Sequence, residues 1–72
     1  MSNEQFLKSL GIQIRKTRER LKISQSELAR LADKDRQNIH QIEKGKVNLT
    51  AISLKEISEA LKVPVKKFFD FD

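Results

Sequence analysis

The sequence predicts an all-α fold, a bundle of about five short helices formed by a single domain over residues 1–72. Apolar residues recur every three or four positions through most of the chain, which is the spacing of one helix face. No stretch alternates β-branched or aromatic residues with polar ones over the length of a strand. A helix-capping residue stands before four of the periodic segments. A chain of 72 residues is expected to form one small core.

The first helix is expected to begin near Ser2 or Asn3, with Asn3 able to cap it, and to end at about Leu21. Its apolar residues share one face: Phe6, Leu10, Ile14 and Leu21. Gly11 lies inside this helix, where glycine costs about 1 kcal/mol relative to alanine. It therefore indicates either the close approach of another helix or a break into two shorter helices.

The second helix is expected to begin at Gln25, directly after a capping signal. Ser24 is followed three residues later by Glu27, the pattern of a reciprocal capping box. Asp33 and Lys34 are expected to end the helix, because aspartate enters the left-handed region at modest cost.

A third helix follows almost immediately, from Arg36 to about Glu43 or Lys44, with Asp35 as its cap and Gly45 just beyond its end. So short a connection permits only a tight angle between the second and third helices. Two short amphipathic helices joined in this way, over about residues 24–44, are typical of a helix-turn-helix.

The remaining chain predicts one longer helix and a short final turn. Residues 48–50 form a loop whose Thr50 can cap the fourth helix, and Pro64 closes that helix. Its buried face is expected to contain four residues: Leu54, Ile57, Ala60 and Leu61. A last turn or helix, Val65 to Phe69, is expected to place Phe68 or Phe69 against the core.

The excess positive charge is confined to the middle of the chain. Residues 13–46 hold ten basic and five acidic side chains, whereas residues 1–12 and 47–72 each sum to zero, so this segment carries the whole net charge of +5. A polyanion such as DNA accounts for this placement, because cationic side chains release the counterions that DNA condenses.

Several function classes are disfavoured by composition. The chain has no cysteine, so disulfides and thiolate metal sites are excluded, and its lone histidine does not make a metal site. Catalysis needs convergent titratable groups, whereas the carboxylates here are explained as caps or end charges. No signal peptide or membrane span is expected. We therefore expect a cytoplasmic protein that is not an enzyme and needs no cofactor, membrane or small-molecule ligand.

The outer face of the third helix carries side chains that can read bases: Arg36, Gln37, His40 and Gln41. Arginine can donate two hydrogen bonds to guanine, and glutamine can pair bidentately with adenine. RNA is a weaker candidate, because all four phenylalanines lie near the chain ends rather than on the basic segment.

Three segments in this order resemble the Cro/C1-type (XRE-like) helix-turn-helix family of phage repressors and restriction-modification controller proteins: IRKTRERLKISQSELA, NIHQIEKGK and LKEISEALKV. The resemblance covers nearly the whole chain. The chain departs from the family pattern at Asp33, where glycine is favoured, at Lys34, where a small apolar residue is usual, and at Leu49, where proline is common.

The resemblance implies a regulator of transcription, a dimeric repressor or autoregulator that reads a palindromic double-stranded DNA operator. It implies base contacts from the outer face of the third helix. Phosphate contacts are expected from Gln25, Asn38, Lys44 and Lys46, with Lys34 and Arg15 added. Asn38 could equally act as a cap, and His40 could be an ordinary surface residue. Arg18 and Glu43 are expected to form a partly buried structural bridge.

Dimerisation is expected to use the apolar C-terminal portion, with Val65, Phe69 and Phe71 at the interface. The alternative is that these phenylalanines only seal the small core. A second functional hypothesis is an antitoxin or protein-interaction adaptor for which DNA binding is secondary; the near absence of a tail beyond the fold disfavours it.

Overall fold

Within residues 1–71, which the computed structural model describes, the chain forms four α-helices and one 3-10 helix. In chain order they are α1 (Asn3–Arg20), α2 (Gln25–Leu31), α3 (Arg36–Glu43), α4 (Ala51–Leu61) and η1 (Val65–Phe69). No strand occurs in this part of the chain. The predicted all-α fold of about five short helices is confirmed.

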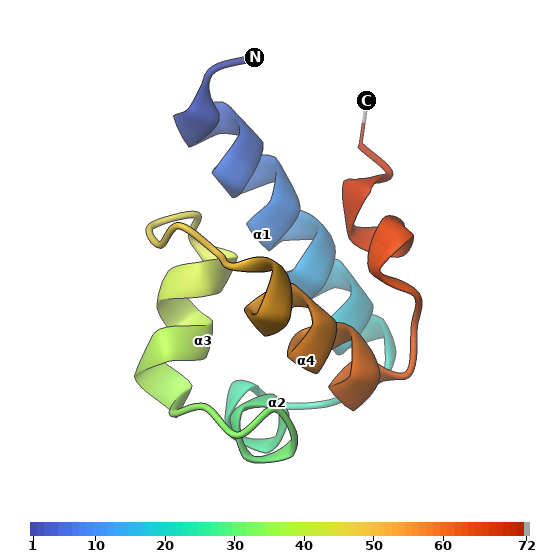
Figure 1. The fold of residues 1–72 in the computed structure, drawn as a ribbon. Helices are drawn as coiled ribbons and strands as arrows, with labels where there is room; N and C mark the ends of the chain where they lie inside the picture. Colours follow the sequence, from blue (N-terminus) through green and yellow to red (C-terminus); the bar gives the residue numbers. More distant parts are fainter. Residues whose placement is uncertain (72) are drawn as a thin grey trace.

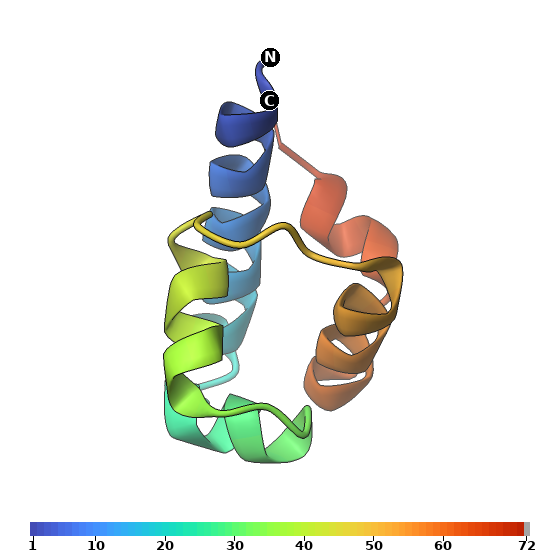
Figure 2. The same ribbon diagram turned by 60° about the vertical axis from the view of Figure 1, so that its left-hand side comes forward.

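The helices enclose the core from two sides and one end. α1 and α3 lie side by side, α4 and η1 form the opposite side, and α2 lies across the end away from both chain termini (Figures 1 and 2). All the helices contribute to one apolar core, which contains Leu10, Ile14, Leu28, Ala29, Ala32, Ile39, Ile42, Ile57, Leu61 and Phe68. Either Phe68 or Phe69 was expected against the core, and Phe68 is the one that is fully buried.

The helix N-termini follow the sequence signals with two corrections. Ser2, not Asn3, caps α1, and it forms the reciprocal capping box with Gln5. At α2, the Ser24 hydroxyl accepts a hydrogen bond from the Glu27 backbone N–H at 3.0 Å, but the reciprocal half is missing. The Glu27 carboxylate instead accepts two hydrogen bonds from Arg30, because a charged donor one turn along competes with the backbone N–H.

Gly11 lies where α1 meets the end of α3, and α1 runs through it without a break. A Cβ atom at this position would lie 2.6 Å from the carbonyl oxygens of both Ile42 and Glu43. The close approach of another helix is therefore the correct alternative. The expected apolar face of α1 is only partly buried, because the side chains of Phe6 and Leu21 remain 38% and 45% exposed.

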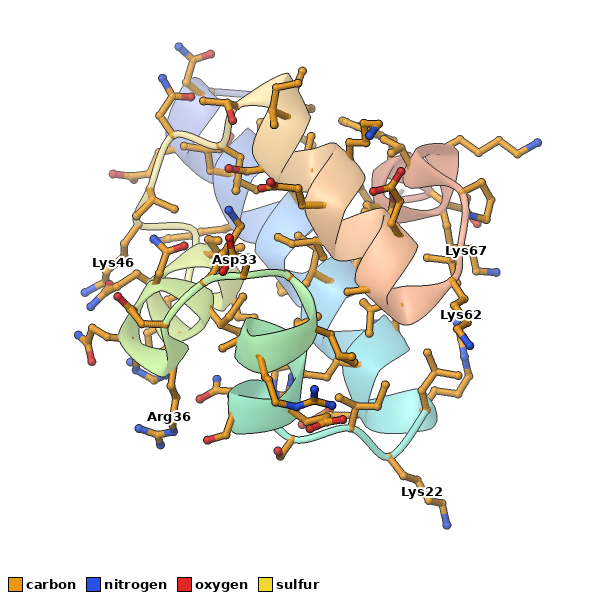
Figure 3. The ribbon with its side chains drawn as sticks, turned by 60° about the horizontal axis from the view of Figure 1, so that its bottom comes forward. Lys22, Asp33, Arg36, Lys46, Lys62 and Lys67 are labelled. Carbon is orange, nitrogen blue, oxygen red and sulfur yellow. The ribbon has the colours of Figure 1, made fainter. Side chains whose placement is uncertain are left out.

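Three helices end in residues with positive φ that are not glycine. Lys22, Asp33 and Lys62 have φ values of 60°, 57° and 59°, and Figure 3 labels all three. After each of them, the next backbone N–H returns to a carbonyl oxygen five residues earlier, which closes the helix. Only α3 ends at the glycine that such a turn favours, Gly45, with a φ of 73°.

Candidate nucleic-acid interface

Helix α3 presents its polar side outward because its apolar side is anchored in the core. Ile39 and Ile42 are 0% and 2% exposed. The Asp35 carboxylate accepts a hydrogen bond from the Asn38 backbone N–H at 2.7 Å, which fixes the first turn. The surface opposite the two isoleucines is therefore free to meet a partner.

The four predicted base-reading residues lie on this outer surface to different degrees. Arg36 and Gln37 are exposed, whereas His40 and Gln41 are half-buried. Figure 3 shows Arg36 and Lys46 extending outward on one side of the molecule, away from Lys62 and Lys67. The most exposed of these four side chains thus belong to the first turn of α3.

Beside α3 is a hollow of about 320 Å³ where α1, α2 and α3 meet. Its lining residues come from all three helices and the end of α3: Arg15, Arg18, Gln25, Arg36, His40, Glu43 and Lys44. The fold thus brings Arg15 and Lys44, which are 29 positions apart in sequence, to the same hollow as Arg36. The hollow is thus lined by the cationic groups of Arg15, Arg36 and Lys44 together with the bridged Arg18 and Glu43.

The expected bridge between Arg18 and Glu43 is confirmed. The guanidinium donates from Nε to Glu43 Oε2 at 2.7 Å and from Nη2 to Glu43 Oε1 at 3.0 Å, and both side chains are at most 10% exposed. A third hydrogen bond runs from Nη1 to the Ile23 carbonyl at 2.8 Å. The hydrogen bond with Glu43 raises the pKa of Arg18 despite the opposing effect of burial. The bridge ties α1 to the end of α3.

Three predicted phosphate contacts are engaged within the protein, and Arg15 is one of them, through an exposed contact from Nε to Glu19 Oε2 at 3.0 Å. Gln25 donates from Nε2 to Glu43 Oε1 at 3.1 Å, so one amide N–H is already used. The Lys34 ammonium group donates to Ser53 Oγ and Glu56 Oε1 on α4, and its side chain is only 13% exposed. The expected phosphate contact of Lys34 would therefore compete with this pairing to α4.

The cations after α3 are placed by a glycine turn. Gly45 packs against the backbone of Lys8, where a Cβ atom would lie 2.7 Å from Lys8 Cα. The Lys46 backbone N–H donates to the Gln41 carbonyl at 2.9 Å, and the Lys44 and Lys46 side chains are exposed. The two lysines thus flank a rigid turn at the end of the helix.

The predicted interface residues at the C-terminus form part of an aromatic cluster. Phe69 is 41% exposed, and Val65 and Phe71 are half-buried. The ring of Phe6 lies with its centroid 5.9 Å from that of Phe69 and 5.7 Å from that of Phe71. Sequence reasoning missed Phe6 as a member of this surface, because helical periodicity placed it on the inner face of α1.

The comparisons identify the family. A family model described as Helix-turn-helix matches residues 14–68. The chain belongs to the helix-turn-helix family. It is accordingly a DNA-binding regulatory protein and not an enzyme.

Two solved structures support the fold of this helix-turn-helix protein. The restriction-modification controller protein C.AhdI from Aeromonas hydrophila is 27% identical, with a TM-score of 0.86 over 88% of this chain and 96% of its own. The clp gene regulator ClgR from C. glutamicum is 20% identical, with a TM-score of 0.86 over 89% of this chain and 83% of its own. No curated protein sequence matches.

Among residues 1–71, no three histidine, aspartate or glutamate side chains are grouped so as to hold a metal ion. No helix in the same part of the chain is long and apolar enough to cross a membrane.

Proposed function

We propose that the chain is a cytoplasmic, sequence-specific regulator of transcription that binds a palindromic operator as a homodimer and acts as a repressor or autoregulator. The observation that carries this proposal is the orientation of α3. Its two isoleucines are fully buried, and its first turn projects exposed Arg36 and Gln37 away from the protein. A short helix with a polar outer face fits the width of the DNA major groove.

Within the groove, Arg36 and Gln37 are proposed to read base edges, with His40 and Gln41 contributing from less exposed positions. Arginine pairs with guanine O6 and N7, and glutamine with adenine N6 and N7. Each good bidentate contact is worth about 1–3 kcal/mol of discrimination against a wrong base. One helix of eight residues therefore discriminates poorly, and a symmetric pair of helices doubles the number of bases that are read.

Phosphate contacts are proposed for Arg15, Lys44 and Lys46, with Asn38 and the remaining N–H of Gln25 nearby. Lys44 and Arg15 share the hollow beside Arg36, and Lys46 is exposed on the same side of the molecule (Figure 3). These contacts would hold α3 in register along the groove without reading sequence themselves.

The dimer surface is proposed to be the aromatic cluster of Phe6, Phe69 and Phe71 together with Val65. Beside this cluster lies an apolar hollow of about 480 Å³ that Phe6 and Phe69 help to line. Apolar surface of this kind, gathered at one end of a small protein, favours association with a second copy. In the dimer, the two α3 helices would enter successive major grooves about 34 Å apart.

The test is selection of bound sites from random double-stranded DNA, followed by affinity measurements with three variants. Arg36→Ala should weaken binding to the selected site and relax the preference at one base pair. Lys46→Ala should weaken binding to all sequences alike. Lys67→Ala is the matched control, because Lys67 extends on the other side of the molecule (Figure 3). Equal losses on selected and random DNA for Arg36→Ala would reject the assignment of Arg36 as a base reader.

The dimer is tested separately by sedimentation equilibrium. Phe69→Ala should shift the equilibrium toward the monomer, whereas Leu31→Ala, which removes a side chain of similar exposure on α2, should leave it unchanged. A parent chain that stays monomeric at all concentrations, or a selected motif without two-fold symmetry, would overturn the homodimer.

A further inference from the structure

Lys34 is the residue at which the turn of the helix-turn-helix is joined to α4. Its ammonium group donates to Glu56 Oε1 at 3.1 Å and to Ser53 Oγ at 3.2 Å. The Lys34 side chain is 13% exposed, while that of Glu56 is 42% exposed. The aliphatic stem of Lys34 is therefore covered by protein, and the ion pair lies at the edge of the solvent.

The backbone of Lys34 is held as firmly as its side chain. Its N–H donates to the Ala29 carbonyl of α2 at 2.8 Å, directly after Asp33 in the left-handed region. The next residue, Asp35, caps α3. One residue thus links α2 through its backbone, α4 through its side chain, and α3 through the chain itself.

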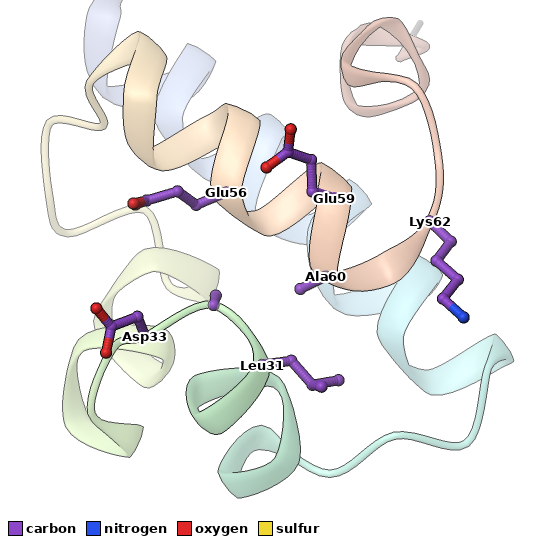
Figure 4. A pocket seen from close by; sticks show the side chains of 7 residues that line it. Leu31, Asp33, Glu56, Glu59, Ala60 and Lys62 are labelled. Carbon is purple, nitrogen blue, oxygen red and sulfur yellow. The ribbon is translucent and has the colours of Figure 1, made fainter.

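The acidic residues around the pair of Lys34 and Glu56 lie along one hollow. A hollow of about 350 Å³ separates the end of α2 from α4, with Glu56 and Glu59 extending from α4 and Asp33 from the turn (Figure 4). The neighbouring Glu59 is paired with Lys55 at 3.1 Å. The contact from Lys34 to Glu56 therefore spans from the turn to α4 along the edge of an open hollow.

We infer that Lys34, through Glu56, is a positioning residue that sets the direction of α3 and thereby the discrimination between DNA sites. This inference rests on the proposed role of α3 in reading bases. An α-helix of eight residues is about 12 Å long, so a tilt of about 10° about its end at Glu43, which Arg18 holds, displaces the first turn by about 2 Å. Such a displacement exceeds the tolerance of a hydrogen bond to a base edge. Helix α3 packs mainly on α1 and α2, so the Lys34 contact supplies its link to α4.

The competing role for Lys34 is a direct contact to a DNA phosphate, and the two roles predict opposite effects of removing Glu56. If Lys34 positions α3, Glu56→Ala should lower the ratio of affinity for the selected site to affinity for random duplex by about tenfold, the loss expected for one base contact. The dependence of affinity on salt should stay unchanged. If Lys34 binds phosphate, Glu56→Ala frees its ammonium group, tightens binding to every duplex and steepens the salt dependence.

Lys34→Met keeps the covered stem and removes the charge, and it should reproduce the loss of discrimination with an unchanged salt slope. The exchange Lys34→Glu with Glu56→Lys should restore discrimination, since the pair is rebuilt in reverse, although the turn then carries a negative charge. Glu59→Ala is the matched control: it breaks a Lys–Glu pair of the same 3.1 Å length on the same helix, and it should leave discrimination intact.

A measurement without DNA completes the test. Residual dipolar couplings of backbone amides in the folded, DNA-free protein should show that α3 changes its direction relative to α2 in Lys34→Met but not in Glu59→Ala. Unchanged α3 couplings, tighter binding by Glu56→Ala, or a loss of thermal stability with unaltered discrimination would each overturn the positioning role. If the parent chain prefers no duplex sequence at all, the proposed function fails. The dipolar couplings still test whether the pair of Lys34 and Glu56 sets the direction of α3.

Discussion

Breaking the bridge between Arg18 and Glu43 should cost far more stability than breaking an exposed ion pair. Glu43→Gln removes the charge that faces a guanidinium in a bridge whose side chains are 10% and 3% exposed. The cost of breaking one partner of a buried pair is about 3–5 kcal/mol, because the other charge is left desolvated. A domain of this size has a total free energy of unfolding of about 4–11 kcal/mol. One substitution should thus remove a large part of the stability.

The matched control is Glu19→Gln, which breaks an Arg–Glu pair with a comparable contact distance of 3.0 Å to Arg15. Those side chains are 62% and 52% exposed, so the expected cost is about 0.3–0.5 kcal/mol. Because water already solvates both charges, their mutual attraction adds little. The two substitutions have the same chemistry and differ chiefly in burial.

The assay is urea denaturation followed by circular dichroism at 222 nm. With a slope of about 1 kcal/mol per molar urea, Glu43→Gln should lower the midpoint by about 3–5 M, and Glu19→Gln by less than about 0.5 M. Replacing both partners, as Arg18→Met with Glu43→Leu, should recover much of the loss, since neither charge remains buried. A Glu43→Gln midpoint within about 0.5 M of the Glu19→Gln midpoint would refute the argument from burial.

Four further outcomes follow from the same contacts. Gly11→Ala should cost about 1–3 kcal/mol in urea denaturation, because its Cβ would overlap carbonyl oxygens of α3; an unchanged midpoint would show that the helices can separate freely. Lys22→Gly should stabilise by about 0.5–1 kcal/mol in the same assay, because it relieves a φ of 60°, and a loss of stability would contradict this. Arg30 lowers the pKa of Glu27 by hydrogen bonding, so this pair should stabilise the protein above pH 4.5 and lose its effect as the pH falls through the lowered pKa. An NMR titration of the Glu27 carboxyl carbon with a midpoint at or above 4.5 would exclude this pH dependence. With about six phosphate contacts per dimer, the logarithm of the DNA association constant should fall with the logarithm of salt concentration with a slope of about −5, and a slope near zero would argue against a DNA backbone surface.

Sequence reasoning succeeded where the determining interaction is local. Ser24, Asp35 and Thr50 each cap the helix that follows them, because a side-chain oxygen needs only a backbone N–H three residues away. The half-formed capping box at Glu27 shows the limit of this reasoning. Arg30 lies equally near and offers a charged donor, and the pattern of Ser24 and Glu27 alone cannot weigh that competitor.

Interactions between distant segments were predicted only where a family resemblance supplied the pairing. Arg18 and Glu43 are 25 positions apart, and nothing in their local sequence joins them. The partner of Lys34 lies 22 positions away on α4, and the resemblance offered none because the family has a small apolar residue there. Phe6 was missed for a related reason: its periodicity is that of a core residue, but its ring lies against those of Phe69 and Phe71 and stays 38% exposed.

The ion pairs of the described residues show which cations near α3 remain available to a polyanion. Arg18, Arg30 and Lys34 are each matched by a carboxylate, through contacts of 2.7, 2.7 and 3.1 Å. Among the residues that the structure describes, no carboxylate lies within 4.0 Å of the cationic groups at the start and end of α3, those of Arg36, Lys44 and Lys46. Arg15, which lines the hollow beside Arg36, is paired with Glu19 through an exposed contact of 3.0 Å. Since an unpaired, exposed cation can release counterions from DNA on binding, Arg36, Lys44 and Lys46 offer positive charge to a polyanion at both ends of the reading helix.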